Sequence, residues 1–231
     1  FNHAERHPVA TELYAYGPHA ATGQFEIGDP GLGIESANGI DLAIHYANPI
    51  VSASLTAFYT DFSDYIYGDP TGEEIDELPV YQFTHVDAVF RGLESELTWH
   101  AWHGADSFLD FGLLVDWVDT EIKESSNNLP RIPPARAGLD VRYGRDQWTL
   151  RSTLRRSFSQ EDTAPFEEAS DAYTNWSASL LLDLPVTKGQ WHLVISGENL
   201  LDEEIHTHTS PIKDVAPAPG RHVRVNLAVA F

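Results

Sequence analysis

The chain ends in the sequence RHVRVNLAVAF (residues 221–231), in which apolar residues alternate with polar or small ones. Every second residue from Val223 to Phe231 is apolar, and the residues between them are Arg, Asn and Ala. A period of two with one apolar face is typical of a half-buried β-strand. A transmembrane barrel strand places such a face in lipid and aromatic residues at the membrane–water interface. The stretch, with its terminal Phe231, therefore predicts a transmembrane β-strand.

The same alternation recurs along the chain, in residues 40–46, 51–59, 93–99, 109–117, 139–143, 148–155, 176–184 and 191–196. A partial strand at 1–5 and the last strand bring the total to about ten, each near the ~10 residues of a tilted span. The opposite faces carry Asp, Glu, Arg and Thr, which a wet lumen tolerates and a packed core does not. We expect an all-β fold, an antiparallel transmembrane β-barrel that is here a partial barrel of about ten strands.

The connections between these strands alternate in length. The short ones are residues 47–49, 103–106, 144–146 and 187–189, and the long ones are roughly 8–33, 62–79, 121–134, 160–172 and 202–220. Outer-membrane barrels have short periplasmic turns and long extracellular loops. Six aromatic residues flank the short turns and predict an aromatic girdle there: Tyr46, Trp99, Trp102, Tyr143, Trp148 and Trp191.

Composition excludes several classes of protein. The chain has 35 acidic and 14 basic residues, and its formal charge of −21 argues against nucleic-acid binding, which needs a basic surface. The acidic excess fits exposed loops that concentrate cations. The absence of cysteine excludes disulfides and thiolate metal sites. The sequence has neither a Gly-x-Ser-x-Gly elbow nor a His-Glu-x-x-His helix, so we do not expect an enzyme.

Several segments resemble one known family. They are 129–136 (LPRIPPAR), 197–202 (GENLLD) and 219–221 (PGR) before the last strand, with shorter matches at 5–8, 12–14 and 92–94. Together they resemble the C-terminal part of the β-barrel of a TonB-dependent outer-membrane receptor. That family has a 22-stranded barrel closed by an N-terminal plug, in the bacterial outer membrane. We therefore expect residues 1–231 to be the C-terminal portion of such a barrel, with the plug and the first barrel strands absent.

The resemblance also implies partners. They are the TonB energy-transducing complex, contacted through the missing N-terminal part, the barrel-assembly machinery, which would recognise the strand ending at Phe231, and the lipid bilayer with its lipopolysaccharide. No nucleic acid is expected. The resemblance implies no required cofactor, and it implies zinc or an iron chelate as transported cargo.

The function expected from the resemblance is active uptake of a metal ion or metal chelate, with zinc favoured. Segment 17–30 is similar to one in zinc-uptake members of the family. Glu204, His206 and His208 alternate, so a regular strand would direct all three to the lumen, and two imidazoles with a carboxylate suit zinc. His19, His85 and His222 are further candidate ligands from other loops or strands. The alternative is that these residues are ordinary polar groups of the wall, and a bulge in this stretch would separate the three.

Other functions stay open at this point. A ferric-siderophore or haem receptor is one alternative, and the interior Arg142, Arg151 and Arg155 could bind an anionic siderophore or pair with Asp116 or Asp140. A passive porin-like or structural barrel is another, and an outer-membrane hydrolase with a catalytic cluster on its outer rim is a third. The histidines near the short turns, which are His45, His100, His103 and His192, are expected to have ordinary structural roles.

Overall fold

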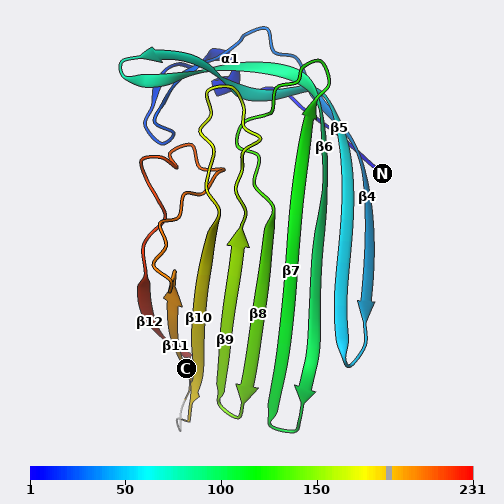
Figure 1. The fold of residues 1–231 in the computed structure, drawn as a ribbon, viewed down its shortest axis with the longest axis vertical. Coiled ribbons are helices and arrows are strands. Elements are labelled where there is room, and N and C mark those ends of the chain that lie inside the picture. Colours follow the sequence, from blue (N-terminus) through cyan, green and yellow to red (C-terminus); the bar gives the residue numbers. More distant parts are fainter. Residues whose placement is uncertain (186–188, 231) are drawn as a thin grey trace.

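The computed structural model describes residues 1–185 and 189–230, which form one antiparallel sheet with an irregular segment beside it (Figure 1). Ten strands follow one another across the sheet: β1 (Asn2–Arg6), β4 (Glu35–Ala47), β5 (Val51–Ile75), β6 (Leu78–His103), β7 (Ser107–Ile122), β8 (Arg136–Arg145), β9 (Trp148–Ser157), β10 (Tyr173–Leu184), β11 (Gln190–Glu198) and β12 (His222–Ala230). The expected fold of about ten antiparallel strands is confirmed. The proposed turn residues Thr187 and Lys188 and the terminal Phe231 lie outside the described residues.

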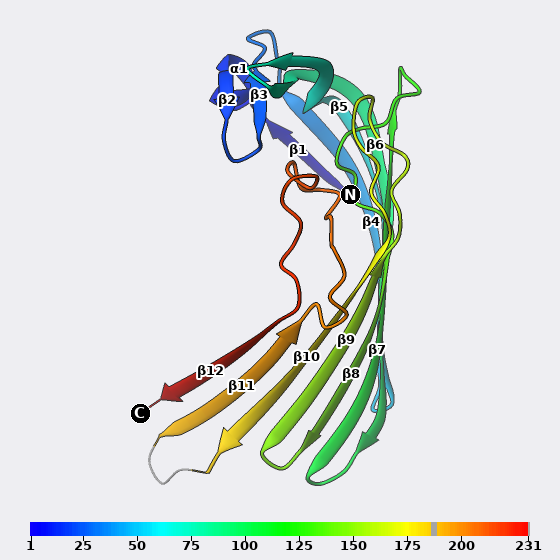
Figure 2. The ribbon, with the colours of Figure 1, turned by 60° about the vertical axis from the view of Figure 1, so that its left-hand side comes forward.

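The sheet is open and strongly curved. β1 and β12 stand at the two ends of the strand order, and residues 199–221 lie on the concave side (Figure 2). The described short turns gather at one end of the sheet and the long connections at the other (Figure 1). None of the described helices is long and apolar enough to cross a membrane.

The expected loop at 62–79 is wrong, because β5 and β6 continue as one hairpin to Ile75 and Leu78. Two register shifts interrupt this hairpin, between Phe62 and Tyr65 and between Pro70 and Glu74. Such bulges break the alternation of side chains without ending the backbone pairing. The alternation of apolar and polar residues is therefore interrupted in residues 62–79, although the two strands continue to pair.

The long connection expected at 8–33 holds structure of its own. It contains the short helix α1 (Ala10–Tyr14) and the hairpin of β2 (Tyr16–His19) and β3 (Gln24–Ile27). β3 pairs in parallel with β6 at Phe25 and Val80, so this connection is attached to the extension of the main sheet. Both of these residues are buried.

The two faces of the sheet differ in chemistry. One face, called the lipid face below, exposes large apolar side chains in mid-strand, including Leu42, Ile44, Leu113 and Leu139. A soluble sheet would cover such residues, and a membrane-spanning wall presents them to lipid. Three of the six residues of the expected girdle are exposed on this face, Tyr46, Trp99 and Trp102, and the other three are half-buried: Tyr143, Trp148 and Trp191.

The opposite face, called the lumen face below, carries paired charges. Arg136 Nε lies 2.7 Å from Asp116 Oδ1, and Arg151 Nε lies 2.7 Å from Asp140 Oδ2. The pairing expected for Arg151 is therefore present, whereas Arg142 contacts Asp110 instead. A face with this many charges is compatible with a wet interior only.

Candidate functional site

An arginine and two carboxylates hold the N-terminal connection to the sheet. Arg6 at the end of β1 donates to both oxygens of Glu35 (3.0 and 2.9 Å) and to both oxygens of Glu12 (3.0 and 2.9 Å). Glu35 also accepts the amide of Ile66 at 2.9 Å, and Glu12 accepts the amide of Val9 at 2.8 Å. Bidentate pairing with well-buried carboxylates fixes geometry as well as charge. The network therefore sets where residues 7–34 lie at the long-loop end.

Glu204, His206 and His208 lie in an irregular loop (residues 199–221), in agreement with the long connection expected at 202–220, and not on the regular strand that would direct all three to the lumen. Asn199 adopts a left-handed backbone (φ 48°) directly after β11 and stops the strand. Its side-chain amide donates to the carbonyls of Glu203 (2.8 Å) and Pro219 (3.2 Å) and so ties the two ends of the loop together. Segment 197–202, one of those that resemble the receptor family, therefore closes this loop.

The three residues of that loop point to different surroundings. His206 donates from Nδ1 to the carbonyl of Lys213 (2.6 Å), and its Nε2 lies 3.3 Å from Glu204 Oε1. The hydrogen bond to Lys213, followed by the contact with Glu204, raises the pKa of His206 above its usual value. The ring of His208 is buried instead, and burial lowers its pKa.

The buried His208 packs against a second loop. Its Nδ1 hydrogen bonds with Ser170 Oγ at 3.0 Å. Its Nε2 lies 3.5 Å from Glu167 Oε1, and this nitrogen makes no hydrogen bond to any described residue. Lys213 also crosses to this loop and donates to the carbonyl of Glu168 at 2.6 Å. Residues 199–221 are thus docked on residues 160–172, which makes His208 part of a loop–loop contact.

The remaining predicted ligands lie in separate pairs. His19 Nδ1 lies 2.7 Å from Glu26 Oε1, and His85 Nδ1 lies 2.7 Å from Asp64 Oδ1. His222 Nδ1 donates to the carbonyl of Gly220 at 3.0 Å. Within the described part of the chain, none of the six predicted residues belongs to a group of three or more potential metal ligands.

Residues of the 129–136 segment organise the long-loop end. The side chain of Leu129 is 1% exposed and packs with Ala88 and Ile122. Arg131 donates to Gln24 Oε1 at 3.0 Å, and its guanidinium lies 5.3 Å from the centre of the Tyr81 ring. This segment therefore connects β6, β7 and the N-terminal connection.

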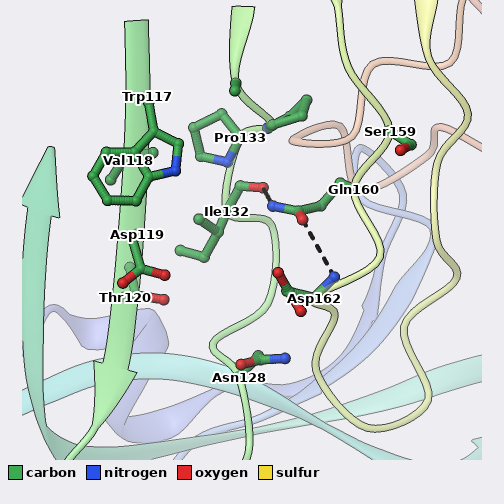
Figure 3. A pocket seen from close by; sticks show the side chains of 12 residues that line it. Trp117, Val118, Asp119, Thr120, Asn128, Ile132, Pro133, Ser159, Gln160 and Asp162 are labelled. Carbon is green, nitrogen blue, oxygen red and sulfur yellow. Dashed lines mark hydrogen bonds between the residues drawn. The ribbon is translucent and has the colours of Figure 1, made fainter. Parts of the chain in front are cut away.

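A polar cavity of about 370 Å³ lies between β7 and the two following long connections (Figure 3). Gln160 spans it by donating to the carbonyl of Ile132 (3.0 Å) and accepting the amide of Asp162 (3.3 Å). Asp119 and Asn128 also line it. None of the six predicted ligands lines this cavity, so it is separate from the histidines of the loops.

A different group of ligand atoms does converge, at the short-turn end of the sheet. His100 Nδ1, His103 Nε2 and Asp110 Oδ1 all lie within 4.8 Å of one another. Sequence reasoning assigned both histidines ordinary roles and missed this cluster. The sequence spacing does not predict the cluster, because residues three apart lie on opposite faces of a regular strand. A bulge in β6, between His100 and Trp102, brings the two histidines to the same face.

An open, curved antiparallel sheet with an apolar outer face and a charged inner face is part of the wall of an outer-membrane β-barrel. Residues 1–200 match the family described as "TonB dependent receptor-like, beta-barrel", and the chain belongs to this family. Its location is therefore the bacterial outer membrane, and the family consists of transporters rather than enzymes.

Solved structures share the fold. The chain is similar to the "Copper transporter OprC" (19% identity, TM-score 0.80, 99% of this chain and 36% of that one). It is also similar to the ferric enterobactin receptor PfeA of Pseudomonas aeruginosa (21%, TM-score 0.71, 99% and 37%) and to the siderophore receptor PirA of the same organism (17%, TM-score 0.62, 99% and 38%). The chain spans a little over a third of the length of these proteins.

Proposed function

We propose that this chain forms part of the wall of an active-transport receptor that takes up a metal ion or a metal chelate. The observation that carries the proposal is the family membership over residues 1–200 together with the two-faced sheet. In the proposed receptor, residues 1–231 are the C-terminal part of the barrel and act with a plug and the remaining barrel strands. The proposed partners are the TonB complex, the barrel-assembly machinery, and the lipid and lipopolysaccharide around the wall.

Zinc is the cargo we favour, and the exposed pair of Glu204 and His206 is the proposed contact in this chain. Donation from His206 Nδ1 to the Lys213 carbonyl leaves Nε2, 3.3 Å from Glu204 Oε1, as the nitrogen that would meet a metal together with this carboxylate. A backbone carbonyl in this role is the usual support for a metal-binding histidine. The other four candidates would contribute only after the loops move, because each makes a separate contact away from Glu204 and His206: His208, His19, His85 and His222.

A ferric siderophore is the second candidate cargo. The structures of siderophore receptors that share this fold support it. The docked loops at 160–172 and 199–221 would then surround a larger ligand. The negative charge of the chain would attract such a chelate less strongly than it attracts a bare cation.

Calorimetric titration of the full-length receptor in detergent tests the proposal, with Zn²⁺ and a ferric catecholate siderophore as ligands. A zinc receptor binds Zn²⁺ tightly, and the Glu204→Ala/His206→Ala double variant weakens binding at least tenfold, about 1.4 kcal/mol. The matched control is His192→Ala, which removes a wall histidine paired with Asp183 and keeps the Glu204–His206 pair. Siderophore binding without Zn²⁺ binding overturns the zinc assignment, and binding of neither ligand overturns the receptor proposal.

A further inference from the structure

A β-bulge at the short-turn end of β6 places two histidines on one face. His100 pairs with Asp110 of β7, and the next paired residue is Trp102, opposite Leu109, so Ala101 is the extra residue. Without this shift His103 would face lipid when His100 faces the lumen. With it, Trp102 stays 58% exposed on the lipid face and both imidazoles meet the carboxylate of Asp110.

The three side chains converge on a single atom. His100 Nδ1 lies 2.9 Å and His103 Nε2 lies 2.7 Å from the same oxygen, Asp110 Oδ1. The side chains of Asp110 and His100 are 8% and 20% exposed and are held in the wall, whereas that of His103 is 52% exposed and faces the turn. The ligand atoms lie within 4.8 Å of one another, a spacing close to the roughly 3.3–3.6 Å between ligands that sit about 2.0–2.2 Å from a tetrahedral zinc ion.

Neighbouring groups hold two of the three ligands, His100 and Asp110, by their other atom. Ser52 Oγ hydrogen bonds with His100 Nε2 at 2.9 Å, which leaves Nδ1 for the cluster. Arg142 contacts the second carboxylate oxygen, Asp110 Oδ2, at 3.4 Å and is itself placed over the Phe108 ring at 4.8 Å. Outer contacts that orient imidazole and carboxylate ligands are a regular feature of metal sites. Asp110 Oδ1 is therefore the oxygen available to a cation.

We propose that His100, His103 and Asp110 form a binding site for a borderline divalent cation such as zinc, built into the wall beside the β6–β7 turn. Two neutral imidazoles and one carboxylate are a suitable ligand set for such an ion and leave a fourth position to water. The site is distinct from the loop residues proposed to meet cargo, because it lies at the opposite end of the sheet (Figure 1). A cavity of about 480 Å³ lined by His103, Phe108 and Arg142 gives a cation access from the turn side.

A second histidine–carboxylate contact on the lumen face differs from this cluster because it is only a pair. His192 and Asp183 lie 2.6 Å apart on the lumen face near the same end of the sheet, but they have no third ligand. This pair has the same chemistry and a similar position, and it therefore provides a matched control.

The test is titration of the metal-stripped, full-length receptor with Co²⁺, whose visible absorption becomes intense when the ion is held in a four-coordinate site, followed by displacement with Zn²⁺. We expect His100→Ala, His103→Ala and Asp110→Asn each to remove one bound equivalent or to weaken it at least tenfold. His192→Ala and the Glu204→Ala/His206→Ala double variant should retain that equivalent. Protease resistance of each purified variant confirms that the barrel is folded.

Two results would overturn the proposal. One is a folded wild-type receptor that binds no Co²⁺ or Zn²⁺ beyond what the Glu204/His206 double variant removes. The other is a folded Asp110→Asn protein that binds as tightly as the wild type. In either case the three side chains only form hydrogen bonds between β6 and β7 and hold no metal.

Discussion

Replacement of Arg6 by methionine removes the cation that two well-buried carboxylates share. The side chains of Glu35 and Glu12 are only 10% and 13% exposed, so each would keep an uncompensated charge in a poorly solvated place. Breaking a buried pair by removing one partner costs about 3–5 kcal/mol. Arg6 itself is 38% exposed, and solvent screening lowers the expected cost to about 2–3 kcal/mol.

The effect should be local, because Arg6 holds residues 7–34 and not the membrane-spanning wall. The amides of Gly28 and Asp29, which donate to Ala15 (2.7 Å) and Glu12 (2.8 Å), report the opening of this segment. Hydrogen exchange on the full-length receptor in micelles should show them roughly 30- to 150-fold less protected in Arg6→Met.

Two control variants separate charge from packing. Adding Glu35→Gln to Arg6→Met removes one of the two uncompensated charges and should recover part of the loss. Arg91→Met breaks an ion pair with Asp119 in which both side chains are more than a third exposed, and it should cost under about 1 kcal/mol. Protection of Gly28 and Asp29 within twofold of wild type in Arg6→Met would refute the reasoning.

Three further changes test other parts of the account. Burial lowers the pKa of His208, so its folded form favours the neutral ring. Docking of residues 199–221 should be strongest above pH 6.5 and weaken as the pH falls below it, and hydrogen exchange between pH 7.5 and 5.5 should show a smaller acid-side loss in His208→Asn. Leu42→Arg places a charge on the lipid face, where it should cost up to about 2–4 kcal/mol in urea unfolding from lipid vesicles, against about 0.5 kcal/mol on a solvent-exposed surface. Gly92→Val forces a side chain into the Phe58 ring and to 2.6 Å from the Trp117 carbonyl oxygen, so it should cost at least about 1–3 kcal/mol in the same assay.

The sequence predicted the wall well, because lipid and lumen impose strict alternation on each strand. Residues such as Leu139 and Asp140 must face opposite sides wherever a strand crosses the membrane. The alternation fails beyond the membrane, where no lipid imposes it. The hairpin that runs to Ile75 was therefore taken for a loop, and its bulges near Tyr65 and Pro70 hid the pairing.

Glu204, His206 and His208 would share one face only on a regular strand, and the loop that follows Asn199 does not provide one. Spacing alone cannot show that the side chain of Asn199 closes a loop on Pro219, or that His208 turns into a contact with Ser170. The cluster at His100 and His103 was missed because residues three apart lie on opposite faces of a regular strand. The extra residue Ala101 brings both histidines to the same face. A bulge changes side-chain direction without a clear signal in residue type.

Uptake into whole cells tests the central claim most directly. The full-length receptor is expressed in a strain that lacks its own zinc and siderophore receptors, and accumulation of labelled zinc and of labelled ferric siderophore is followed with and without a functional TonB complex. The account predicts that at least one of these cargoes accumulates against its gradient only when the complex is present. Uptake that is unchanged when the complex is removed would identify a passive pore and contradict the account.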